Sequence, residues 1–305
     1  MNRYYLTSIA YTIATACYLA AVLPWRWWLI ALTIAPLTSI VTHTPMFILG
    51  LLLGDHDNRK PQTVMMTALM IAASAWFALQ SGWVHYVAWA MLAFLFVLPH
   101  VLFLYPTLVA NSQLLGPVIT CFETRERELW LTIDDGPASD TPTLLDLLDA
   151  RGVRATFFVK GTLADEAGLR AITDRGHTIG NHSFSHPSGT FWCLGPRAIE
   201  REIERGVPSP LFRAPVGMKN PFVHPVLAKR GMRLIGWTAR GFDGTMSDVE
   251  RVVSRVVPRL APGAIVVMHQ GREWSLRCIE RVIGEAQRLG YRFVIPDDGA
   301  LKTKR

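Results

Sequence analysis

The sequence predicts an α-helical membrane domain followed by an α/β domain whose parallel sheet is closed, or nearly closed, into a barrel. The first observation is an uneven distribution of charge. Residues 1–120 hold four of the 31 basic and two of the 24 acidic side chains, and residues 61–122 hold none. The second is that, from Leu129 onward, short β-rich runs alternate with amphipathic stretches, which is typical of repeated β/α units.

Four uncharged segments in the N-terminal third are long enough to cross a hydrocarbon core as helices. They are Tyr4–Leu23, Trp27–Leu53, Gln62–Gln80 and Trp83–Ala110. Tryptophans gather at the segment ends, where amphipathic rings favour the headgroup level. We therefore expect residues 1–112 to be a transmembrane domain of about four helices in the inner or plasma membrane, with the lipid bilayer as a partner.

Basic residues near the segment ends predict the orientation of this integral membrane protein. The turn before the third segment carries Arg59 and Lys60, and the exit after the fourth carries Arg125 and Arg127. The turn between these two segments carries no basic residue. Because short loops rich in Lys and Arg stay in the cytoplasm, we expect the C-terminal domain on the cytoplasmic side.

Seven candidate strands follow along the chain: Leu129–Ile133, Ala155–Val159, Thr178–Gly180, Leu211–Arg213, Arg233–Gly236, Ala264–Met268 and Arg292–Ile295. Helical patterns lie between them, for example over residues 197–205 and 248–260. Five helices end in a glycine, which tolerates the left-handed backbone that closes a helix: Gly152, Gly176, Gly206, Gly231 and Gly290. We expect a linker over 113–128, a catalytic domain over 129–298 and a basic tail over 299–305. Chemistry in such barrels sits where the strands end.

Two motifs at strand ends favour a metal site. Asp134 and Asp135 follow an apolar strand, so one carboxylate can bind a metal while the other faces an attacking water. An ordinary Asp-Gly turn is the alternative. His182 and His186 lie four residues apart after the third candidate strand, and neutral imidazole is a good zinc ligand. A histidine pair on a helix surface is the alternative, although Pro187 ends this segment.

Three further motifs follow later strands. Arg213 closes its strand, and a guanidinium beside a carboxylate would orient that carboxylate and keep it ionised. Trp237 and Asp243 come after the next candidate strand. His269 ends a strand of Ile and Val, where it is well placed to donate a proton; taken alone, it would be read as a core histidine.

In this order the motifs closely resemble the polysaccharide deacetylase family of carbohydrate esterases, which includes chitin, peptidoglycan and nodulation-factor deacetylases. The matching motifs are Thr-x-Asp-Asp-Gly, His-Ser-x-x-His, Arg-x-Pro-x-Gly, Trp, and a strand-ending His, and the resemblance covers roughly residues 125–298. It implies a deformed (β/α) barrel of seven strands. Ile133 stands where the family usually has Phe.

The resemblance implies a role for each residue of the first three motifs. Asp135, His182 and His186 would hold a divalent metal, for which zinc is the expected ion. Asp134 would be the general base, and Arg213 would orient it.

The resemblance also assigns the later motifs. His269 would be the general acid, with Asp243 in place of the carboxylate that tunes it. Val216, Gly217 and Trp237 would bind substrate. Two departures affect this region: Val216 replaces an aromatic residue, and the segment around Asp243 continues with Gly instead of the family's common Asp-Trp ending.

The expected function is removal of an N-acetyl or similar N-acyl group from an amino sugar by a membrane-bound, metal-dependent hydrolase. A lipid-linked glycan or cell-envelope precursor is the expected substrate, because enzyme and glycolipid would diffuse in one plane. Deformylation of a lipid-linked amino sugar, or glycan binding without catalysis, are the alternatives. The net charge of +7 is spread over both parts without a basic face interleaved with aromatics, so no nucleic-acid partner is expected. The sequence does not indicate an oligomeric state.

Overall fold

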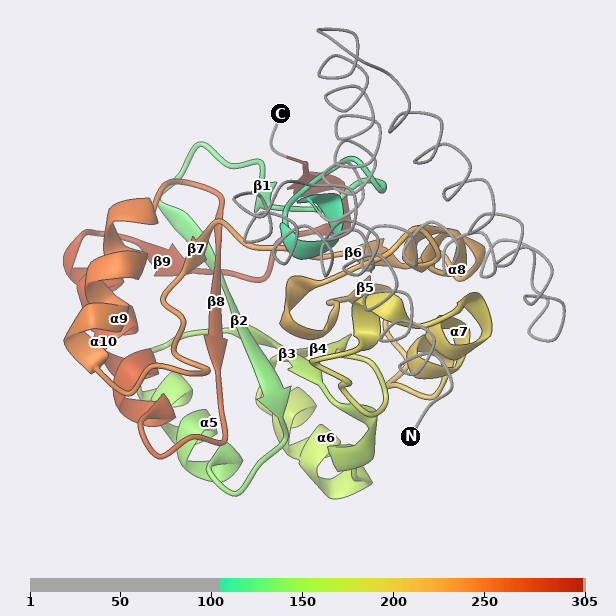
Figure 1. Cartoon of the computed structure of the whole chain (residues 1–305). Helices are drawn as coiled ribbons and strands as arrows, with labels where there is room; N and C mark the ends of the chain where they lie inside the picture. The colour runs from blue at the N-terminus through green and yellow to red at the C-terminus, as the bar shows by residue number, and fades with distance from the viewer. Residues whose placement is uncertain (1–104, 304–305) are drawn as a thin grey trace, which may run out of the picture. The chain divides into compact units, whose positions relative to one another are not determined.

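The computed structural model describes residues 105–303 (Figure 1). The predicted membrane segments lie outside these residues, apart from the last residues of the fourth, so the transmembrane domain and its orientation stay predictions. None of the helices between residues 105 and 303 combines the length and apolarity that a bilayer crossing requires. From Pro106 onward the chain forms a compact unit of its own.

This unit contains a curled sheet of ten strands. Eight of them follow the order β10-β1-β8-β2-β3-β4-β5-β6, while β7 pairs with β8 and β9 pairs with β2. The strands are β1 Cys121–Phe122, β2 Glu128–Gly136, β3 Ala155–Val159, β4 Thr178–Asn181, β5 Leu211–Phe212, β6 Arg233–Leu234, β7 Ala239–Arg240, β8 Ala264–His269, β9 Arg292–Phe293 and β10 Leu301–Lys302. A parallel bridge between Ile119 and Ile235 joins the β6 end of the sheet to the segment that leads into β1. Since β1 also pairs with β8, the strands form the expected barrel-like ring.

Six helices connect the strands of the described region: α5 Thr141–Ala150, α6 Glu166–Asp174, α7 Pro196–Glu204, α8 Val223–Lys229, α9 Val249–Val256 and α10 Ser275–Arg288. The Asp248 side chain caps α9 by accepting a hydrogen bond from the backbone N–H of Arg251. On α10, residues one turn apart bury one face of the helix, as with Cys278 and Val282. Helices α5, α9 and α10 gather outside β2 and β8 (Figure 1).

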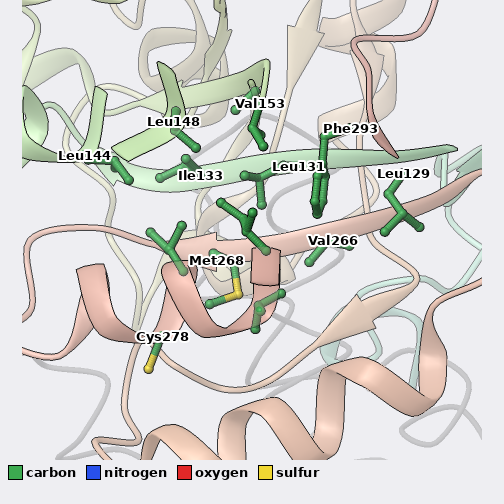
Figure 2. Close-up of a cluster of buried hydrophobic side chains, with 14 of the residues drawn as sticks. Leu129, Leu131, Ile133, Leu144, Leu148, Val153, Val266, Met268, Cys278 and Phe293 are labelled. Carbon is green, nitrogen blue, oxygen red and sulfur yellow. The ribbon is translucent and has the colours of Figure 1, made fainter. Parts of the chain in front are cut away.

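The side chains of β2 alternate between two environments, and this alternation places the first motif. Leu129, Leu131 and Ile133 point outward into a core that they share with Leu144 and Leu148 of α5 (Figure 2). The residues between them, Trp130, Thr132 and Asp134, therefore face the inside of the ring. A carboxylate consequently lies on the inner face at the C-terminal end of the central strand.

The stretches expected to be a linker and a tail both contribute to the sheet. Residues 113–128 contain β1, and residues 299–305 contain β10, which pairs with it in antiparallel register. Val109 and Ala110, which precede residues 113–128, are also held against the barrel, because the Lys219 ammonium donates hydrogen bonds to their carbonyls. The domain boundaries proposed from sequence stay untested, while the packed unit extends beyond 129–298 at both ends.

Four of the five helix-ending glycines have the expected positive φ, between 62° and 80°. Gly206 does not have a positive φ, so the expectation that it closes its helix with a left-handed backbone is wrong. A Cβ at this position would lie 2.4 Å from Oδ1 of Asn181, so a glycine is required because the backbone passes close to a buried amide.

Leu131→Ala should lower the free energy of unfolding by about 2–5 kcal/mol, because it opens a cavity in the core between β2 and α5. Denaturant unfolding followed by tryptophan fluorescence measures the change. The matched control is Leu163→Ala, at a position 43% exposed, which should stay within about 0.5 kcal/mol of the parent protein. Equal effects of the two substitutions would contradict the assignment of this core.

Candidate active site

The predicted site residues meet at one end of the ring. Asp134 on β2 and His269 on β8 are register partners in a parallel pair, so their side chains lie at the same level on the inner face. His182 directly follows β4 and Arg213 directly follows β5, while Asp243 lies on the loop after β7. These are the C-terminal ends of the strands, where barrel folds assemble their chemistry.

Asp135, His182 and His186 form a cluster in which one potential ligand atom from each residue lies within 4.8 Å of the others. Oδ1 of Asp135 is 3.6 Å from Nε2 of His186 and 3.9 Å from Nε2 of His182. The backbone turns sharply to achieve this, because Asp135, Ser183 and His186 all have positive φ. Such conformations are strained for residues other than glycine, and they recur at functional sites.

The donor set of this cluster fits a divalent metal. Nδ1 of His182 donates to the carbonyl of Arg213 at 2.8 Å, which leaves the lone pair of Nε2 directed at the cluster. Burial lowers the pKa of His182, and it lowers the pKa of His186 to about 4, so both imidazoles are neutral at pH 7. Oδ1 of Asp135 is buried without a hydrogen-bond donor in the described region. Two neutral imidazoles and one carboxylate suit zinc and leave coordination positions open.

Asp134 is held by a buried arginine. Nη1 of Arg213 donates to Oδ1 of Asp134 at 2.7 Å and to the Thr132 hydroxyl at 2.8 Å. Nη2 donates to the carbonyl of Gly236, and the guanidinium lies 4.1 Å from the ring centroid of Phe158. The arginine therefore occupies one carboxylate oxygen and leaves Oδ2 facing Nε2 of His182 at 3.8 Å.

His269 is paired with a buried carboxylate. Asp243 accepts through Oδ1 from Nδ1 of His269 at 3.0 Å and through Oδ2 from the backbone N–H of His269 at 2.6 Å. Burial opposes protonation of His269, but the charge and hydrogen bond of Asp243, together with the charges of Asp134 and Asp135, outweigh it, so the pKa of His269 is raised. The departure from the family's Asp-Trp ending thus leaves this carboxylate in contact with the histidine. The Trp274 indole donates to the carbonyl of Asp243 at 2.6 Å and fixes the loop.

The three predicted substrate-binding residues lie close to this rim. Val216 is 39% exposed and has a φ of +49°, so its side chain is accessible. Gly217 packs against Trp237, whose ring a Cβ on Gly217 would approach to 2.5 Å. Trp237 itself is only 9% exposed, and its backbone carbonyl accepts a hydrogen bond from Asn111. Trp237 is thus largely buried, while Val216 is accessible to a ligand.

Sequence reasoning missed three cations beside the carboxylates. Nζ of Lys160 lies 3.3 Å from Oδ1 of Asp135, and Nη2 of Arg272 lies 4.0 Å from its Oδ2. Arg240 lies on β7 and stacks on Trp237, with 5.0 Å between the guanidinium carbon and the ring centroid. Lys160 directly follows β3, so the strand-end criterion that located the motifs would also have found it. Arg240 gave no such signal because β7 is only two residues long.

The chain is similar in sequence to known deacetylases. A model of the family described as polysaccharide deacetylase matches residues 122–235. The chitooligosaccharide deacetylase of Bradyrhizobium sp. (strain ANU 289) is 32% identical over 191 residues, which cover 54% of this chain and 87% of the relative. The peptidoglycan-N-acetylglucosamine deacetylase of Bacillus cereus is 30% identical over 55% of this chain and 86% of the relative.

A solved structure extends the comparison to the fold. The family 4 carbohydrate esterase from Streptomyces lividans, in complex with acetate, superposes with a TM-score of 0.52 at 30% identity, over 57% of this chain and 95% of that chain. The relatives are named as deacetylases, which confirms the prediction of an enzyme of the carbohydrate N-deacetylase class. This chain belongs to the polysaccharide deacetylase family.

Proposed function

We propose that this enzyme removes an N-acetyl group from an amino sugar by metal-dependent hydrolysis, and that its substrate is a membrane-borne glycan precursor. One observation carries the proposal. A metal-binding cluster, an arginine-held carboxylate and a carboxylate-paired histidine share the rim of one barrel. The relatives' names, which specify chitooligosaccharides and peptidoglycan N-acetylglucosamine, support acetyl as the acyl group and an amino sugar as its carrier.

Asp135, His182 and His186 would hold the divalent metal, for which zinc is the expected ion. When bound, such a metal polarises the amide carbonyl and lowers the pKa of a bound water. The chain orients these ligands in advance through the hydrogen bond from His182 to the Arg213 carbonyl and through the positive φ of Asp135.

Asp134 is the general base in this proposal. Arg213 keeps Oδ1 occupied, so Oδ2 is the oxygen that takes the proton from the attacking water. The guanidinium also holds the carboxylate in one orientation while the amide carbon is attacked.

His269 is the general acid. Its Nδ1–H is directed at Asp243, so Nε2 is the atom that donates a proton to the leaving nitrogen as the C–N bond breaks. The products are acetate and the free amine of the sugar, and no covalent acyl-enzyme is needed. Asp243 contributes by holding the ring and by favouring its protonated form.

The membrane-borne substrate is supported by the uncharged segments of residues 1–112, which would place enzyme and glycolipid in one plane. Two alternatives to deacetylation differ from it in the acid that the protein would release. A deformylase would release formate from a lipid-linked amino sugar, and a glycan-binding protein without catalysis would release neither acid. The complete set of acid, base and metal-binding side chains favours catalysis. Assay of acetate and formate release from a panel of lipid-linked and polymeric amino sugars separates the three.

Asp134→Asn should leave the bound metal in place and lower kcat by about 10²–10⁴-fold, because an amide cannot take the proton from water. His182→Ala should instead lose the metal. Elemental analysis of the purified proteins gives the metal content, and acetate release gives the turnover. Turnover in Asp134→Asn at the parental rate would contradict the assignment of the base, provided that its melting temperature shows a folded protein.

Asp243→Asn should move the alkaline limb of the pH–rate profile to lower pH. Asp243 raises the pKa of His269, so the histidine stays protonated to higher pH in the parent enzyme. An uncharged amide removes that effect, so the pKa falls and the acid is lost earlier as the pH rises. Measurement of kcat/KM against pH tests this. An unchanged alkaline limb would show that His269 is not the group whose titration it reports.

A further inference from the structure

Arg240 is a charged residue of the inner face that the mechanism above does not use. It is the register partner of Val267 in the parallel β7–β8 pair, and Val267 precedes His269 by two residues. Side chains two residues apart on a strand share a face, so Arg240 emerges inside the ring, about 7 Å along the strand direction below His269. Its guanidinium lies close enough to Asp243 and Asp134 for their charges to act on it.

Two aromatic rings hold the Arg240 guanidinium in place. Its central carbon lies 5.0 Å from the ring centroid of Trp237 and 4.4 Å from that of Phe242. Phe242 has a φ of +66°, an uncommon conformation for a bulky residue, and it remains 44% exposed. A strained loop therefore holds an accessible ring over this cation.

The hydrogen-bond donors of Arg240 are not used within residues 105–303. The Arg213 guanidinium forms hydrogen bonds and an ion pair. In the same region, the Arg240 guanidinium forms neither. Ring stacking uses the faces of a guanidinium and leaves its edge N–H groups free. Because Arg240 is partly exposed, these donors are open to a ligand that approaches the rim.

The charges around the rim also favour an anionic ligand. Asp134 is neutralised by Arg213, and Asp243 is paired with His269. Asp135 has both Lys160 and Arg272 within 4.0 Å, before any metal is considered. Arg240 forms no ion pair within residues 105–303, although the charges of Asp243 and Asp134 act on it. It therefore brings the lysine and arginine cations at this rim to one more than the carboxylates, and a divalent metal would add more positive charge. An excess of one charge sign at a cleft concentrates ligands of the opposite sign.

We propose that Arg240 binds an oxyanion carried by the substrate, a phosphate or a carboxylate attached to the amino sugar, and thereby selects charged precursors over neutral chitin-like chains. This inference rests on the proposed N-deacylation of an amino sugar. The planar guanidinium, held against Trp237 and Phe242, would offer two parallel N–H groups to such an oxyanion. Sugar phosphates of lipid-linked precursors and carboxylate-bearing muramyl sugars share this chemistry.

The test compares Arg240→Gln with the full-length parent on three substrates: N-acetylglucosamine 1-phosphate, N-acetylmuramic acid and neutral di-N-acetylchitobiose. Arg240→Gln should lower kcat/KM about 10–100-fold on at least one anionic sugar, mainly through KM, and about twofold or less on the neutral one. The anionic sugar with the larger loss distinguishes phosphate from carboxylate. Arg240→Lys should restore part of the activity, because it keeps the charge but loses the planar fork.

Arg255→Gln is the matched control, because Arg255 also lies over the Phe242 ring, at 5.2 Å, but extends from α9. It should leave all three substrates unchanged. Equal losses on neutral and anionic sugars in Arg240→Gln, or no loss on either anionic sugar, would overturn the proposal.

A binding measurement separates this inference from the proposed function. Calorimetric titration with glucosamine 1-phosphate, glucosamine and muramic acid should show tighter binding of an anionic sugar, weakened about 10–100-fold in Arg240→Gln. If the parent releases no acyl group from any substrate but shows this pattern, the proposed function fails and the Arg240 site stands. If acetate is released and Arg240→Gln binds all three sugars like the parent, the Arg240 site fails and the function stands.

Discussion

The ion pair between Arg213 and Asp134 is the interaction on which the rest of the site depends. Both side chains are almost completely buried, at 1% and 3% exposure. A buried charge is costly unless it is paired and hydrogen-bonded, and breaking such a pair leaves the remaining charge uncompensated. Here the guanidinium also donates to Thr132 and to the carbonyls of Ile235 and Gly236. One side chain thus links β2, β5 and the end of β6 while it positions the proposed base, Asp134.

The same arginine connects the proposed base to the candidate metal-binding cluster. Its backbone carbonyl accepts the hydrogen bond that fixes the tautomer of His182, and its side chain fixes Asp134. The proposed base and the proposed metal ligand are therefore oriented by one residue, whose own position is set by the parallel pairing of β5 with its neighbours. His269, on the strand β8 that neighbours β2, is oriented in the same way by Asp243, through hydrogen bonds from its ring and from its backbone N–H. Precise positioning of this kind is what a hydrolytic site requires, since small displacements of reacting groups cost large factors in rate.

The sequence predicts the long buried strands well, because their apolar residues leave a clear pattern. The bounds of β3 are those expected, and β2 and β8 continue past the expected C-terminal ends into the site, where they include Asp134 and His269. The two-residue strands β1, β7 and β10 carry no periodic signal, and they form because neighbouring strands offer backbone partners. Arg240 was missed for that reason, since its position on the inner face follows only from the register of β7 with β8. The strained conformations of Asp135 and Phe242 likewise depend on tertiary contacts and not on residue type.

The most direct test of this account is a metal titration of the full-length enzyme with acetate release as the readout. The cluster of Asp135, His182 and His186 predicts that removal of metal by a chelator abolishes turnover. Zinc added back should restore turnover in proportion to the zinc bound, up to about one equivalent per chain, because the three side chains would hold a single ion. Undiminished turnover in protein shown by elemental analysis to be free of divalent metal would contradict the account.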